Sequence, residues 1–139
     1  MASTDAIPFA TPALTWLQPQ PLVAELGLGQ GFDAAKLLQQ LAVLRDQPQV
    51  HAIVAFGSRA RGDARPDSDL DLAVICTEPS LTPAEKTERS FRYRQLLGPL
   101  GCGVDLVVVG AADARRLAGS RWHVMGDVAR EGRVLYVAG

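Results

Sequence analysis

The sequence predicts an α/β (α+β) fold with a single mixed β-sheet flanked by helices. Two short apolar runs, 50–56 and 70–76, are rich in Val and Ile and are typical of strands buried on both faces. A third run of this kind covers residues 104–109. A helical pattern over 82–97 connects the second run to the third, as expected for a crossover between parallel neighbours.

The chain is expected to begin with an irregular extension, residues 1–30, and to continue as one folded domain over 31–139. Positions 8, 12, 19 and 21 of the extension are prolines, which leaves room for at most one short helix, 21–26. We assign the extension no chemistry. It could cover part of the sheet or serve as a partner-binding arm.

The first long helix is predicted over 33–47. Its leucines recur at helical spacing, Asp33 can cap its start, and Pro48 follows its end. The helix over 82–97 begins with a capping-box pattern, Thr82 to Glu85, and ends before a Gly-Pro pair.

The C-terminal part is predicted to add two helices and an edge strand, namely 111–118, a helix from a Ser120 cap to residue 131, and 134–137. In the second of these helices, Trp122, Met125 and Val128 are expected to face the core. In the long helix predicted over 82–97, Phe91 and Tyr93 are expected to pack the helix against the rest of the fold, although Tyr93 could be exposed. His51 and His123 lack a partner at metal-ligand spacing and are expected to be structural or surface residues.

Composition bounds the function. The 139 residues suffice for one domain, and 47% apolar and 21% charged residues are ordinary for a soluble protein. A net charge of −1 argues against a broad nucleic-acid surface. No basic leader or membrane-length apolar stretch is evident. Cys76 and Cys102 form no CxxC pair, so we expect reduced thiols in a cytoplasmic protein.

Acidic side chains gather near the starts of the second and third strands. Asp69 and Asp71 are two residues apart, so they project side by side about 7 Å apart. That span suits one cation or a metal pair about 4 Å apart. Parallel pairing would bring Asp105 to the same edge of the sheet. The first strand must then run antiparallel to the second for the Gly57–Ser58 turn to reach that edge.

The turn supplies groups suited to an anion. Gly57 permits close backbone approach, and Ser58 can cap a short helix through Arg61 whose free N–H groups would face a triphosphate. Arg59 and Arg61 are within reach, and only one is expected to point at the ligand. Alone, each feature has a plainer interpretation: a solvated strand end, an ordinary turn, a surface arginine run. Together, at these spacings, they favour a metal–nucleotide site.

A family resemblance follows from these residues. Gly57-Ser58, ten residues and then Asp69-Leu70-Asp71 match the Gly-Ser-x10-Asp-x-Asp pattern of DNA polymerase beta-like nucleotidyltransferases. The fuller string over 57–62 resembles the minimal nucleotidyltransferase branch, which includes antitoxins paired with HEPN-domain toxins. It is also similar to the nucleotide-binding half of aminoglycoside nucleotidyltransferases. Residues 130–136 are similar to a tail common in the minimal branch.

The resemblance implies a polymerase beta-like fold and a nucleotidyltransferase active site. Asp69, Asp71 and Asp105 would bind two Mg²⁺ ions, and Asp105 would also act as base towards the acceptor hydroxyl. The residues implied to bind the nucleotide are Gly57, Ser58, Arg59, Arg61 and Ser68. The implied reaction is attack of a hydroxyl on the α-phosphorus of a nucleoside triphosphate such as ATP, with release of pyrophosphate.

Three hypotheses about the function follow. The first is transfer of AMP to a protein partner, a HEPN-type toxin, because the chain leaves no room for a second substrate-binding domain. The second is transfer to a small molecule such as an aminoglycoside, which would require a homo-oligomer to wall the pocket. The third is a binding module that holds a nucleotide or partner without turnover. None of them involves a membrane.

Overall fold

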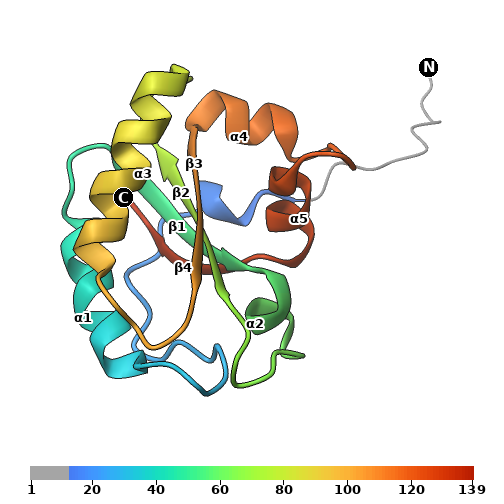
Figure 1. The fold of residues 1–139 in the computed structure, drawn as a ribbon. Coiled ribbons are helices and arrows are strands. Elements are labelled where there is room, and N and C mark those ends of the chain that lie inside the picture. Colours follow the sequence, from blue (N-terminus) through green and yellow to red (C-terminus); the bar gives the residue numbers. More distant parts are fainter. Residues whose placement is uncertain (1–12) are drawn as a thin grey trace.

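The computed structural model describes residues 13–139 as one mixed four-stranded sheet flanked by helices (Figure 1). The strand order is β3-β2-β1-β4, and the strands are β1 Val50–Phe56, β2 Leu70–Cys76, β3 Val104–Gly110 and β4 Arg133–Val137. Strand β1 is antiparallel to β2 and β4, whereas β2 and β3 are parallel. The predicted mixed sheet, with its antiparallel first pair and parallel second pair, is confirmed.

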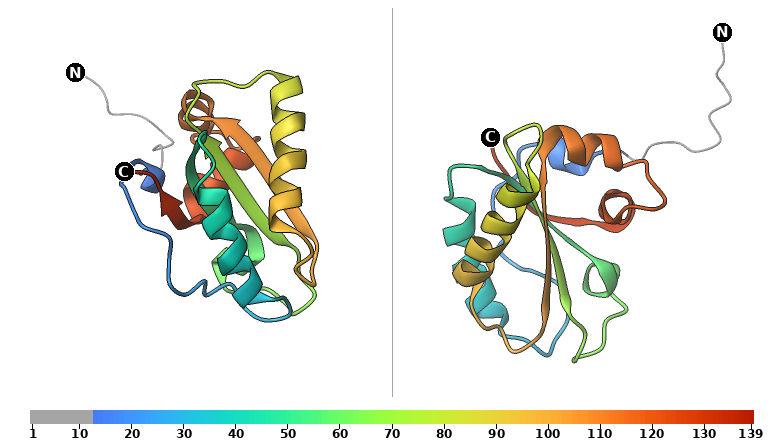
Figure 2. Two further views of the ribbon diagram at one scale, coloured as in Figure 1. Left: turned by 90° about the vertical axis from the view of Figure 1, so that its left-hand side faces the viewer. Right: turned by 45° about the horizontal axis from the view of Figure 1, so that its top comes forward.

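Helices cover both faces of the sheet (Figure 2). The helices are a 3-10 helix Thr15–Leu17, α1 Ala34–Arg45, α2 Gly57–Arg61, α3 Pro83–Leu97, α4 Ala111–Leu117 and α5 Val124–Glu131. Helices α1 and α3 pack on one face, and α4 and α5 pack on the other. Within residues 13–139, no helix has the length and apolar character needed to cross a membrane.

The two long helices begin as their sequences predict. The Asp33 carboxylate accepts a hydrogen bond from the Lys36 amide at 3.0 Å and caps α1. Thr82 and Glu85 form the reciprocal capping box of α3. Leu37, Leu41 and Leu44 of α1 are fully buried against the sheet, Leu38 is partly buried, and Tyr93 of α3 is buried with them.

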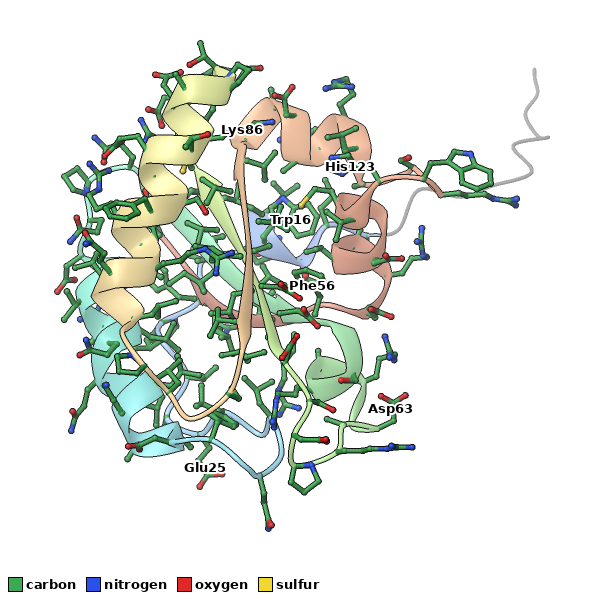
Figure 3. All side chains as sticks on the ribbon, viewed as in Figure 1. Trp16, Glu25, Phe56, Asp63, Lys86 and His123 are labelled. Atoms are coloured by element: carbon green, nitrogen blue, oxygen red, sulfur yellow. The ribbon has the colours of Figure 1, made fainter. Side chains whose placement is uncertain are left out.

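The opposite face has its own core. Met125 and Val128 of α5 are buried there, as their spacing predicts, beside Phe56 of β1. Trp16, from the N-terminal segment, is 1% exposed in the same cluster. Figure 3 shows Trp16 and Phe56 on the side of the sheet where α5 lies.

Two aromatic residues expected in the core are exposed. The prediction for Trp122 is wrong, since it is 94% exposed. Trp122 lies before α5, which starts only at Val124. The residues before the helix form a turn in which the Ser120 hydroxyl accepts hydrogen bonds from the backbone amides of Trp122 and His123. The cap is therefore His123, whose Nδ1 accepts the Met125 amide at 3.1 Å, and not Ser120. Phe91 of α3 is also exposed.

The N-terminal segment covers the β4 edge of the sheet. Gln20 bridges to Val137, and the Val23 amide donates to the Leu135 carbonyl at 3.0 Å. The predicted helix 21–26 is wrong, because these backbone groups bond to β4 instead of to one another. Of the predicted 1–30 extension, residues 1–12 lie outside the described part of the chain.

Candidate active site

Two acidic side chains face each other across the parallel pair. Asp71 of β2 and Asp105 of β3 are in register. Because residues in register share a face, both carboxylates project on the side covered by α5, where Ala73 and Val107 continue their rows. Strand pairing thus brings together two acids that lie 34 positions apart, as the connectivity predicted.

The environment of Asp71 disfavours a negative charge. Burial, followed by the nearby Asp105 carboxylate and its hydrogen bond, raises the pKa of Asp71 to about 6. Asp69 adds to this effect, and Arg61 opposes it. When a neighbouring negative charge raises the pKa of a carboxyl group, a bound cation stabilises its ionised form. A cation between Asp71 and Asp105 would offset the charge of both groups.

Asp69 lies in the loop directly before β2. Strand β2 pairs with β3 only from Leu70 onward, and the Asp69 side chain lies against Gly103 of the loop before β3. In residues 13–139, no three His, Cys, Asp or Glu side chains are arranged so that they could hold a metal ion. The role of Asp69, Asp71 and Asp105 as metal ligands stays a prediction.

The turn after β1 lies directly against Asp71. Phe56 is in register with Asp71, and Gly57 has φ +74°. A Cβ added to Gly57 would lie 2.1 Å from Asp71 Oδ2, so both the conformation and the space require glycine. The predicted Ser58 cap is wrong: α2 begins at Gly57, so Ser58 is already inside the first turn.

Glu131 is a site residue that the sequence did not reveal. Its Oε1 accepts the Gly57 amide at 3.2 Å and Arg61 Nη1 at 3.0 Å. It is the last residue of α5 and lies 74 positions from Gly57, so no local spacing links the two. The sequence pointed to Glu131 only through the similarity of residues 130–136 to the C-terminal tail common in the minimal nucleotidyltransferase branch.

Arg59 does not reach the site, which corrects the expectation that it binds the nucleotide. It is 1% exposed, and its guanidinium makes five hydrogen bonds to backbone carbonyls. The acceptors are Leu28, Gln30, Pro66 and Ser68, the last of which accepts two bonds. Since a guanidinium has five N–H donors, none remains for a phosphate. Arg59 therefore ties the loop before β2 to the N-terminal segment.

The other loop residues have mixed placements. Arg61 is exposed beside the turn and pairs with Asp63 at 3.2 Å in addition to Glu131. The pairing of Asp63 with a loop arginine was expected. The Ser68 hydroxyl accepts a hydrogen bond from the Arg65 amide at 2.9 Å, which closes the loop on itself. The O–H of Ser68 can still donate, so its contact with a nucleotide stays a prediction.

The comparison with protein families agrees with this site. The family described as "Polymerase beta, Nucleotidyltransferase" matches residues 39–137, which include the turn, all three acids and Glu131. The chain belongs to this nucleotidyltransferase family. Membership confirms the fold class that the resemblance implied, and it makes the chain a nucleotidyltransferase by family.

Solved structures of similar fold include toxin–antitoxin complexes. One, a toxin–antitoxin with AMP-PNP, is 23% identical over 75% of this chain and 73% of that chain, with a TM-score of 0.47. Another, the tri-AMPylated HEPN toxin of Shewanella oneidensis with its MNT antitoxin, is 20% identical over 74% and 73%, with a TM-score of 0.43. None of the curated proteins compared with the chain matches it. The family assignment rests on the family match alone.

Proposed function

We propose that this nucleotidyltransferase moves a nucleoside monophosphate, AMP in the first instance, from a nucleoside triphosphate to a hydroxyl of a partner protein. The observation that carries the proposal is the register of Asp71 and Asp105 beside the Gly57 turn. A carboxylate pair opposite a glycine turn is suited to a metal-bound triphosphate.

The donor set fits Mg²⁺. This ion is commonly held by one or two carboxylates together with substrate phosphates, and not by a cage made only of protein. Asp71 and Asp105 would be the first ligands, with Asp69 as a third from the loop. A bound divalent cation would supply positive charge to the attacking and leaving oxygens.

The protein groups have separate roles in the proposed reaction. The exposed Asp105 carboxylate accepts the proton of the acceptor hydroxyl, whose oxygen attacks the α-phosphorus. The bond between the α-phosphorus and the bridging oxygen breaks, and pyrophosphate leaves. Ser58 and the backbone of Gly57 contact the phosphates, and Arg61 offsets negative charge at the rim of the site. Arg59 holds the loop in place.

The proposed acceptor is a HEPN-type toxin, with this chain as its antitoxin. Support comes from the resemblance of residues 57–62 and 130–136 to the minimal nucleotidyltransferase branch.

The test is label transfer from α-labelled ATP with Mg²⁺ to a purified HEPN-type protein encoded beside this chain. Wild type should label the partner, and Asp71→Asn and Asp105→Asn should each reduce the rate by about 100-fold or more. Asp67 is an exposed acid in the loop before β2, so Asp67→Asn is the matched control and should transfer the label normally. Equal labelling by all variants, or labelling of an aminoglycoside in place of the protein, would contradict the proposal.

A further inference from the structure

The outer edge of β3 is an open row of backbone groups. In a parallel pair, alternate residues direct their N–H and C=O groups to the neighbouring strand. The Leu70 amide donates to the Gly103 carbonyl at 2.8 Å, and this bond fixes which residues of β3 pair with β2. The backbone N–H and C=O groups of Asp105 and Val107 point towards β2, and those of Leu106 and Val108 point outward.

These outer groups lack the cover that the opposite edge has. Strand β4 is bridged by Gln20, whereas nothing within 13–139 bonds the outer N–H and C=O groups of Leu106 and Val108. The Val104 carbonyl accepts Arg94 Nη1 at 2.7 Å. Proteins usually blunt an apolar edge with proline, bulges or inward-pointing charges, and Leu106 to Val109 has none of these.

A groove of about 590 Å³ runs along this edge. One wall is α3, with Lys86, Phe91 and Arg94, and the other is the start of α5, with His123. Its floor includes Leu106 and Val108 from one face of the sheet and Val107 and Val109 from the other. The groove therefore wraps around the strand edge. Figure 3 shows Lys86 on α3 beside the upper end of β3, and His123 further to the right, next to α4.

The charge of the groove selects its occupant. Lys86 and Arg94 are its charged lining residues, and no acidic side chain lines it. Phe91 is 64% exposed on the α3 wall, where a partner would bury it. The groove therefore complements an extended segment that carries apolar and acidic side chains.

We propose that an extended segment of the acceptor protein pairs with β3 as a fifth strand of the sheet. This inference rests on the proposed function and adds how the acceptor is held. Main-chain bonds to Leu106 and Val108 would fix its register, and Phe91 and Lys86 would contact its side chains. The segment would continue past the Asp105 end of β3, which places its hydroxyl-bearing residue at the carboxylates.

Amide hydrogen exchange tests the pairing directly. The full chain is compared alone and with the purified neighbour-encoded HEPN-type protein. The amides of Leu106 and Val108 should become protected only in the complex, because only then do they gain acceptors. Protection of the same amides in the chain alone, rising with concentration, would identify a second copy as the occupant and overturn the proposal.

Surface variants separate docking from chemistry. Phe91→Asp and Lys86→Glu should each weaken partner binding, Phe91→Asp by about tenfold or more, while ATP binding without partner stays unchanged. Val43→Asp, an exposed apolar residue of α1, is the matched control. If the partner is labelled normally by Phe91→Asp and the two amides stay unprotected, the docking proposal alone fails. If wild type neither binds nor labels it, the proposed function fails as well.

Discussion

At the scale of single residues, two arginines two positions apart have opposite environments. Arg59 is buried and bonded to carbonyls from two segments, whereas Arg61 is exposed and paired with acids. Their sequence context is the same basic run, so no local pattern distinguishes them. The difference arises from the N-terminal segment, whose Leu28 and Gln30 carbonyls are available only in the folded chain.

We expect Arg59→Lys to lower the free energy of unfolding by roughly 2–4 kcal/mol, because one ammonium cannot satisfy four buried or half-buried carbonyls. Urea denaturation followed by circular dichroism measures the change. Arg61→Lys is the matched control and should leave the midpoint unchanged. Equal midpoints for both variants would show that the Arg59 network contributes nothing to stability.

The Asp71 carboxyl should make stability depend on pH. Its folded pKa of about 6 lies above the ordinary value of 3.8, so the folded state binds the proton more tightly. Its contribution is complete below about pH 4 and is lost as pH rises through 6. Without metal at pH 7.5, Asp71→Asn should therefore be more stable, by about 1 kcal/mol after allowance for solvent screening.

Denaturant midpoints of both proteins in EDTA, from pH 4 to 8, provide the measurement. The wild-type midpoint should fall relative to that of Asp71→Asn across pH 4 to 6 and then run parallel to it. Asp67→Asn should follow wild type throughout. A constant gap between wild type and Asp71→Asn at every pH would exclude the proposed repulsion.

At the scale of elements, the site depends on a turn pressed against a strand. Helix α2 starts at a glycine whose missing side chain leaves room for Asp71, and α5 fixes the same turn through Glu131. The β1–β2 register determines this contact, since Phe56 faces Asp71. The two elements that carry the turn and the acid are therefore placed by backbone pairing.

Two glycines at the ends of α2, its first residue Gly57 and its C-cap Gly62, offer a matched comparison. Gly57 and Gly62 both have positive φ, +74° and +87°, but an added Cβ meets Asp71 only at Gly57 and meets nothing within 4 Å at Gly62. Gly62→Ala should cost about 1–2 kcal/mol of backbone strain. Gly57→Ala should cost more and should also abolish transfer, as measured by denaturation and label transfer. Similar losses at both positions would contradict the close contact.

At the scale of the whole molecule, the sequence predicted the features that follow from the order of strands and helices along the chain. The crossover helix required β2 and β3 to be parallel, and that pairing places Asp71 beside Asp105. It did not predict contacts between distant loops and termini, such as Glu131 on Gly57 or Arg59 on residues 28–30. The prediction for Trp122 was wrong because α5 is capped at His123 and not at Ser120, three residues later than predicted, which leaves the Trp122 side chain in solvent.

The most direct test of the central claim compares ATP labelled at the α-phosphate with ATP labelled at the γ-phosphate. Each is incubated with the wild-type chain, Mg²⁺ and the neighbour-encoded HEPN-type protein. A nucleotidyltransferase built on Asp71 and Asp105 should transfer the α label to the protein and release the γ label as pyrophosphate. Transfer of the γ label, or of neither label, would contradict the account.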